Sequence, residues 1–304
     1  MRDRTKGKRT EVISFLEMGL GVTDNANSGL NSPDITLPVF GPVKLDNSAL
    51  AKSSEYAQLL GGVSITKPVA GKFRAVLNVS GTTLNYSRTS NYDIAAVTAL
   101  LAAGYSSERV NITVGPTGSF ALLSGSKYRQ GTGAASSIRV SVGKNGTFHT
   151  EGSFIDLKYF GLNKNRTAQL YALSAGFDRQ FPTLPFKPLL SLSGSYAKES
   201  NRRDRSDFTR KIVGGRADVA VFPSEKTSVM LGYNLSRWTY EGPDLLFGKP
   251  RRDWFSSYDA TVQFLLKPGL SVRLQGQITE DDANIPLYDY KQKIISVALR
   301  REWN

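Results

Sequence analysis

His149 is the only histidine in the chain and the first side chain that could do chemistry. An imidazole acts as a general base when a nucleophile and an orienting carboxylate lie close to it, and Glu151 follows two residues later. No nucleophile is marked, because Thr147 and Thr150 read as ordinary strand residues. Without cysteine, one histidine forms no transition-metal site of usual composition. We therefore expect no enzymatic activity, no cofactor and no metal site.

Asp281 and Asp282 are a second candidate, because carboxylate oxygens bind calcium. A solvated loop that meets cations bound to lipopolysaccharide would contain the same residues. We favour this second interpretation.

Charged residues recur at the polar positions of several alternating segments. If these segments form a membrane barrel, such positions face the lumen, where opposite charges pair to offset desolvation or line a path that selects what passes. We favour a ladder of ion pairs and keep a basic pore wall as the alternative. The lumen-lining candidates are Arg139, Arg216, Asp218, Asp259, Arg273 and Arg300.

Strands must position these residues, and the sequence predicts fourteen of them. Leu274 and Ile278, for example, alternate with Arg273 and Gln275. Many segments reach ten residues, whereas soluble strands average about five or six and a membrane crossing needs roughly 9–11. No stretch approaches the roughly 20 apolar residues of a membrane helix. The predicted strands are 11–23, 53–66, 72–85, 92–105, 109–124, 132–142, 147–160, 167–179, 188–198, 210–222, 227–239, 253–266, 270–279 and 289–303.

The predicted connections alternate between short and long. Short ones are Lys67–Gly71, Ser106–Glu108, Gly143–Gly146, Phe181–Lys187, Pro223–Lys226 and Lys267–Gly269. Long ones are Asp24–Lys52, Ser87–Asn91, Gly125–Gly131, Gly161–Arg166, Glu199–Thr209, Tyr240–Arg252 and Glu280–Tyr288. Transmembrane barrels have short periplasmic turns and longer outer loops. We therefore predict an all-β, antiparallel, up-and-down transmembrane β-barrel of about 14 strands, with both termini in the periplasm.

The final strand carries a candidate signal for barrel assembly. Ile295, Val297, Leu299 and Trp303 share one face, and the chain stops one residue after the tryptophan. An apolar face with a closing aromatic residue is typical of outer-membrane barrels, and it implies contact with lipid and with the barrel-assembly machinery. An edge strand of a soluble β-sandwich is the alternative.

Residues 1–10 hold five basic residues and no apolar core follows them. We interpret them as a basic periplasmic tail or linker stub and residues 11–304 as the outer-membrane barrel. Because no signal peptide is visible, we expect a C-terminal fragment of a longer secreted precursor. A cytosolic protein with a basic tail is the alternative.

The net charge of +13 is spread from Arg2 to Arg301. Nucleic-acid binding would favour one basic patch. A scattered pattern fits a basic lumen or contact with anionic lipopolysaccharide better, so we expect no nucleic-acid partner.

The connection Tyr240–Arg252 holds the apolar residues Leu245, Leu246 and Phe247 beside Arg251 and Arg252. These five are outer-loop candidates. The apolar cluster could fold into the lumen as a plug or contact a partner, or it could pack on neighbouring loops.

Three segments resemble the C-terminal barrel of the surface lipoprotein assembly modifier (Slam) family. They are Leu245–Asp253 (LLFGKPRRD), Asn284–Tyr290 (NIPLYDY) and the more weakly similar Gly21–Asn27 (GVTDNAN). The resemblance implies a fourteen-stranded barrel that follows a periplasmic repeat domain and helps move lipoprotein cargo to the cell surface. Residues 1–304 show no such repeat domain, so we expect it in the longer precursor. Related repeat-plus-barrel proteins export polysaccharides.

The sequence thus leaves three functions to compare. The first is a translocon-type barrel in the outer membrane of a Gram-negative bacterium that assists lipoprotein delivery. The second is a passive porin or a polysaccharide-export barrel. The third is a soluble, basic, nucleic-acid-binding β-protein.

Overall fold

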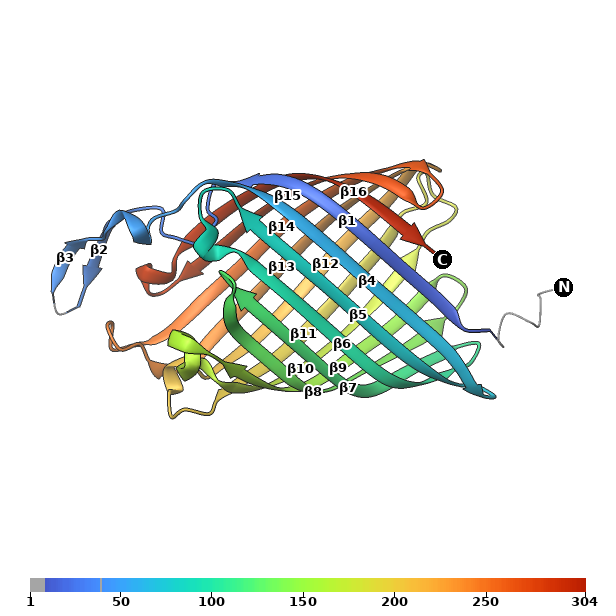
Figure 1. The fold of residues 1–304 in the computed structure, drawn as a ribbon, viewed down its shortest axis with the longest axis horizontal. Helices are drawn as coiled ribbons and strands as arrows, with labels where there is room; N and C mark the ends of the chain where they lie inside the picture. The colour runs from blue at the N-terminus through green and yellow to red at the C-terminus, as the bar shows by residue number, and fades with distance from the viewer. Residues whose placement is uncertain (1–8, 39) are drawn as a thin grey trace.

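The computed structural model describes residues 9–38 and 40–304 and forms a closed antiparallel barrel (Figure 1). Within the described residues, fourteen strands make the wall. They are β1 (Glu11–Thr23), β4 (Ser54–Ala70), β5 (Phe73–Tyr86), β6 (Ile94–Ser106), β7 (Val110–Leu123), β8 (Ser126–Val142), β9 (Gly146–Tyr159), β10 (Ala168–Gln180), β11 (Leu189–Asn201), β12 (Arg210–Ser224), β13 (Thr227–Pro243), β14 (Pro250–Lys267), β15 (Leu270–Ala283) and β16 (Tyr290–Trp303).

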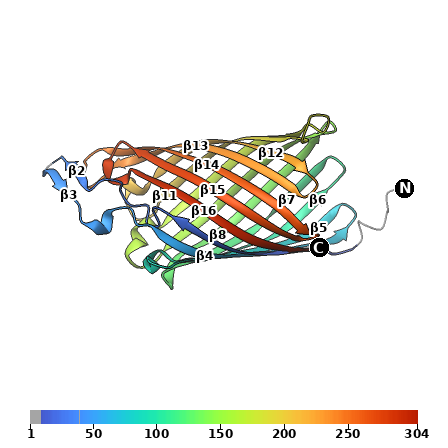
Figure 2. The ribbon, with the colours of Figure 1, turned by 90° about the horizontal axis from the view of Figure 1, so that it is seen from above.

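Smaller elements lie in the connections. Strands β2 (Asp34–Leu37) and β3 (Gly41–Lys44) pair as a hairpin that projects beyond one end of the barrel (Figure 2). The 3-10 helices are η1 (Asn47–Ala49), η2 (Ser90–Tyr92), η3 (Gly161–Arg166), η4 (Ser206–Phe208) and η5 (Pro286–Tyr288). None of the helices in the described parts of the chain is long and apolar enough to cross a membrane.

Each wall strand pairs with the next one along the chain, and β1 closes the barrel against β16. This closing seam runs from the Ser14–Trp303 pair to the Thr23–Ile294 pair. The predicted up-and-down barrel of fourteen strands is therefore confirmed. Strand β1 begins and β16 ends at the same end of the barrel, which we call the inner end (Figure 1).

The polarity of the wall is reversed relative to a soluble protein. Leu20, Leu173 and Val213 each expose more than half of their surface, whereas Ser236 and Ser257 are buried. Side chains alternate between the two faces of a strand, so the outer face is apolar and the inner face is polar. An outward apolar face is stable only against lipid, and a closed sheet satisfies its backbone there.

One predicted connection is wrong. We expected a long loop at Gly125–Gly131, but β7 and β8 meet in the tight turn Ser124–Gly125, where both residues have positive φ (49° and 74°). Residues from Ser126 onward pair with β7 instead. Their polar composition resembles a loop because this end of β8 continues the backbone ladder beyond the apolar band.

The predicted basic tail, residues 1–10, is only partly covered by the described residues. Residues 1–8 of the predicted tail lie outside them. Arg9 and Thr10, which precede β1, are exposed.

A pair of neighbouring substitutions tests the orientation of the wall. Leu274 faces outward beside Val262 and Val297, and Gln275 faces inward beside Ser296. Leu274→Arg should lower the free energy of unfolding by about 2 to 4 kcal/mol, because it puts a charge against lipid. Gln275→Arg should have a small effect. Urea titration of the barrel refolded in vesicles measures both, and equal losses would contradict the orientation.

Candidate functional site: the lumen, the closing seam and the outer mouth

The middle of the lumen holds an arginine between two aspartates. Arg216 donates to Asp218 through Nε at 2.9 Å and through Nη2 at 2.5 Å, and Nη2 lies 3.0 Å from Asp259 Oδ1. The opposing position is Gly232, where a Cβ would come within 2.7 Å of all three side chains. Glycine therefore permits the close approach. With two carboxylates on one guanidinium, the cluster has a net negative charge.

A second cluster crosses the closing seam. Glu17 of β1 is only 4% exposed, and its Oε2 accepts from Arg273 Nη1 at 2.8 Å and from Arg300 Nη1 at 3.4 Å. Arg300 also donates to Glu302 at 2.6 Å and covers the ring of Phe15 at 4.0 Å. These contacts bind the first wall strand to the last two.

We call the end of the barrel opposite the inner end the outer end. There, the seam is closed by side chains of the segment after β1. The backbone N–H of Lys293 donates to Asp24 Oδ1 at 2.7 Å, and Asn25 Nδ2 donates to the carbonyl of Lys291 at 2.9 Å. Gln292 donates to the backbone oxygen of Asn25 at 2.5 Å. Asn25 is fully buried. These bonds replace the ladder where β1 has ended.

At the outer mouth, Arg251 connects β14 to β15 and to the last loop. Its Nε donates to both oxygens of Asp253 at 2.8 Å, and its Nη2 donates to Asp281 at 3.3 Å. The guanidinium lies 3.8 Å from the centroid of the Tyr288 ring and 5.0 Å from that of Tyr240. Asp253 has no exposed surface. A buried carboxylate of this kind depends on its cation.

A neighbouring ion pair extends this cluster around the wall. Arg210 Nε donates to Glu199 at 2.8 Å, and Nη1 donates to the hydroxyl of Tyr240 at 3.0 Å. The same guanidinium lies 4.6 Å from the Trp238 ring centroid. Because Tyr240 contacts both Arg210 and Arg251, the charges of β11 to β15 form one continuous group.

The connection between β13 and β14 folds around Asp244. Its Oδ1 accepts from the backbone N–H groups of Leu246 and Phe247, and its Oδ2 accepts from the hydroxyl of Tyr288 at 2.7 Å. Burial, reinforced by this bond to Asp244, raises the pKa of Tyr288 to about 12, so the phenol remains a donor. Phe247 is buried, while Leu245 and Leu246 are exposed.

The segments that carry the family resemblance therefore meet in space. Leu245–Asp253 contacts Asn284–Tyr290 through the contacts of Tyr288 and also through Asn284, whose Nδ2 donates to the carbonyl of Pro250 at 3.0 Å. Gly21–Asn27 supplies the bonds at the outer end of the seam. All three segments build the outer mouth on the β14–β16–β1 side.

In a catalytic triad, the histidine lies between the nucleophile and the carboxylate. His149 does not have this position. His149 Nδ1 lies 3.3 Å from Asp178 Oδ2, and Ser191 donates to Asp178 Oδ1 at 2.6 Å. The carboxylate thus lies between the serine and the histidine. The Ser191 hydroxyl donates its hydrogen bond to Asp178 and not to the imidazole.

The register places every predicted lumen-lining residue on the inner face. Arg216, Asp218, Asp259, Arg273 and Arg300 make the ion pairs described above. Arg139 lies 3.8 Å from Glu151. Ion pairs, rather than a continuous basic surface, occupy these positions.

Two outer-loop candidates lie elsewhere than expected. Strand β14 begins at Pro250, so Arg251 and Arg252 belong to the wall, with Arg251 facing inward and Arg252 exposed on the outer face. We misplaced this boundary because consecutive charged residues resemble a loop, whereas the pairing of Thr239 with Arg252 continues the ladder. Leu245, Leu246 and Phe247 do lie in the connection.

The residues of the predicted assembly signal lie on the outer face. Ile295, Val297, Leu299 and Trp303 are each at least 41% exposed in the isolated chain. Arg301 shares this face, and its Nη1 reaches back to the carbonyl of Pro268 at 3.1 Å, in the turn between β14 and β15.

Sequence reasoning missed the partners that complete these clusters. Glu17, Asn25, Asp178 and Arg210 were not singled out as candidates. Strand parity could have placed Glu17 and Arg210 on the polar face. Asn25 bonds Gly29 locally, but its partner Lys291 lies 266 residues away in sequence, and only the closed barrel brings these two together.

Comparisons with known proteins identify the fold. OmpT (in-vitro folded), an outer membrane protein of Vibrio cholerae, aligns with a TM-score of 0.55 and 9% identity over 99% of both chains. Its trimer form gives 0.52 and 9% over 97% of this chain and 99% of that one. OccK1 of Pseudomonas aeruginosa gives 0.43 and 8% over 96% and 99%. No family model and no curated protein matches the chain.

The protein is thus an integral β-barrel of the bacterial outer membrane. Its closed wall of fourteen antiparallel strands defines this class. The resemblance to the Slam family rests on the three sequence segments alone.

Adjacent arginines test the outer-mouth cluster. Arg251→Gln should lower the free energy of unfolding by about 3 kcal/mol, because it leaves Asp253 and Asp281 buried without their cation. Arg252→Gln, one residue away on the exposed face, should change it by less than about 0.5 kcal/mol. Urea titration of the refolded barrel measures the difference. Similar values for both variants would show that the cluster does not stabilise the mouth.

Proposed function

We propose that the protein forms a solute pore across the outer membrane. The observation that carries this proposal is the solvent exposure of charged side chains on the inner face. Arg139 and Glu151 face the lumen with side chains that are 53% and 56% exposed. Protein that filled the barrel would cover them, so their exposure favours a water-filled interior.

The ion pairs suggest how such a pore treats charge. Rings of one charge select ions of the opposite sign, whereas paired charges select weakly. The Arg216 cluster has one cation for two carboxylates, and the Glu17 cluster has Arg273 and Arg300 against Glu17 and Glu302. We therefore expect low selectivity that depends on the Arg216 cluster.

Single-channel recording in planar bilayers tests this pore. The native protein should conduct. In a salt gradient, the reversal potential of Arg216→Ser should shift toward the value of a cation-selective pore, because Asp218 and Asp259 lose their partner. Asp218→Asn with Asp259→Asn should shift the reversal potential toward the value of an anion-selective pore. Arg179→Ser removes an exposed arginine from the outer face of β10 and should leave the reversal potential unchanged. Absence of conductance in the native protein would refute the pore.

A second candidate is delivery of lipoproteins to the cell surface, as the family resemblance implies. The convergence of the three resembling segments on the outer mouth and seam supports this candidate. In this proposal, lipoprotein cargo contacts the outer mouth, a periplasmic repeat domain brings the cargo, and the barrel-assembly machinery inserts the wall. Cargo would leave sideways through an opened β1–β16 seam.

A disulfide across the seam separates the two candidates. An ideal Cβ on Gly19 lies 3.3 Å from the Cβ of Ala298, close to the roughly 3.5–4.5 Å that a disulfide spans. Oxidised Gly19→Cys with Ala298→Cys should block surface display of a co-expressed lipoprotein, and reduction should restore it. Ser174→Cys with Ser195→Cys joins β10 to β11 and should not affect display.

The outcomes differ for the two functions. Conductance that survives oxidation while display stops would support lateral delivery in a barrel that also conducts. Display that continues with an oxidised seam, or that never depends on this protein, would contradict lateral delivery and leave the pore.

A further inference from the structure

A groove lies on the lipid-facing side of the wall, and neither a pore nor lipoprotein delivery uses it. Its floor is a line of small residues in register across three strands, Ala175 of β10, Gly194 of β11 and Gly215 of β12. A Cβ on Gly194 or Gly215 would meet no atom closer than 3.5 Å. The floor is therefore open space rather than tight packing.

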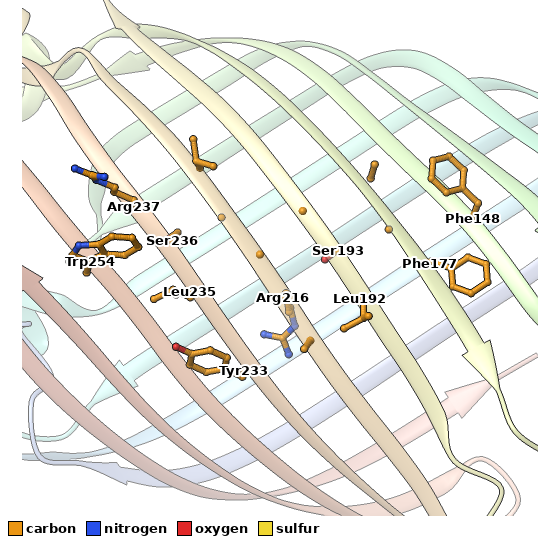
Figure 3. Close-up of a pocket in the computed structure, with 17 residues that line it drawn as sticks. Phe148, Phe177, Leu192, Ser193, Arg216, Tyr233, Leu235, Ser236, Arg237 and Trp254 are labelled. Carbon is orange, nitrogen blue, oxygen red and sulfur yellow. The ribbon is translucent and has the colours of Figure 1, made fainter. Parts of the chain in front are cut away.

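Bulky apolar side chains border this floor. Figure 3 shows Arg237 and Trp254 at one end of the lining residues and Phe148 and Phe177 at the other. Leu192, Val213, Tyr233 and Leu235 complete the border. The groove has a volume of about 940 Å³, at the upper end of the roughly 300–1,000 Å³ of small-molecule sites.

Toward the outer end, strands β11 to β14 carry basic residues on the same face. We call Lys198, Lys211, Arg237 and Arg252 the basic rim. Lys198 lies four residues beyond Gly194, and Lys211 lies four residues from Gly215 toward the outer end. At about 3.3 Å per residue, the Cα of each lysine lies roughly 13 Å along its strand from the floor of the groove.

Two positive charges of the basic rim repel each other. Lys198 and Lys211 lie directly opposite each other on paired strands, and like charges in that position destabilise a sheet. Lys198 has Glu241 at 3.4 Å, but among residues 9–38 and 40–304 no carboxylate lies within ion-pair distance of Lys211, Arg237 or Arg252. Trp254 holds the Arg237 guanidinium 5.4 Å from its ring centroid. The rim therefore has a net positive charge.

We propose that this groove and the basic rim bind a lipopolysaccharide molecule of the outer leaflet. An acyl chain would lie over Gly194 and Gly215, and the phosphates of the lipid headgroup would bind Lys211 and Arg237. Charge complementarity supports this occupant, because the cations lie at the outer ends of their strands and the apolar floor lies deeper. A second copy related by a two-fold axis normal to the membrane would instead bring the rim against itself.

The test uses the complete barrel in a neutral detergent, titrated separately with lipopolysaccharide, phosphatidylglycerol, phosphatidylcholine and inorganic phosphate. Native mass spectrometry counts the bound molecules. Lys211→Gln and Arg237→Gln should each weaken lipopolysaccharide binding about tenfold, because each removes a charge-assisted contact to phosphate. Gly215→Leu should remove binding by filling the groove. Lys127→Gln, at the exposed start of β8, is the matched control and should bind as the native protein does.

Each outcome decides the proposal. Lipopolysaccharide binding that falls in the three variants, in proteins that still show native heat-modifiable migration, supports it. Equal binding of phosphatidylcholine, preference for phosphatidylglycerol, or binding of inorganic phosphate with the same affinity as the lipid would overturn it. A change in oligomeric state in Gly215→Leu with unchanged lipid binding would assign the groove to a second copy of the chain.

Discussion

Closure of the sheet is the constraint on which the rest of the structure depends. A strand edge in lipid would leave backbone donors and acceptors without partners, and each such group costs several kcal/mol. The β1–β16 seam removes that edge. Glu17 holds its inner part through Arg273 and Arg300, and Asp24 and Asn25 hold its outer end. Side chains thus support the seam where the backbone ladder is shortest.

Closure also creates the lumen, and the lumen explains the internal charges. A charge in a dry core is rarely stable, whereas one that faces a partner and water costs far less. The arginines of the wall follow this rule, since Arg216, Arg251 and Arg273 each contact a carboxylate of another strand. Strand parity determines that these arginines face inward, whereas closure of the barrel determines which carboxylates they contact.

This difference separates what the sequence predicts from what it does not. Alternation at Leu274 and Gln275 indicates strands and their two faces, because the period of two is a local property. Boundaries fail where composition contradicts pairing, as at Ser126 and Arg251, where polar residues continue a strand beyond the apolar band. Contacts such as that between Glu17 and Arg273 span 256 residues, and no local pattern contains them.

The seam has a further consequence for how the barrel forms. Every other pair joins wall strands that are consecutive along the chain, so these pairs form with much shorter loop closures, whereas β1 meets β16 only across nearly the whole chain. The seam therefore has the largest loop-closure cost of any strand pair in the wall. Until it forms, Glu17 lacks its contacts to Arg273 and Arg300, and the first strand has a free edge. A factor that shields the edge of β1 during this interval would protect the strand whose partner is farthest away in the sequence.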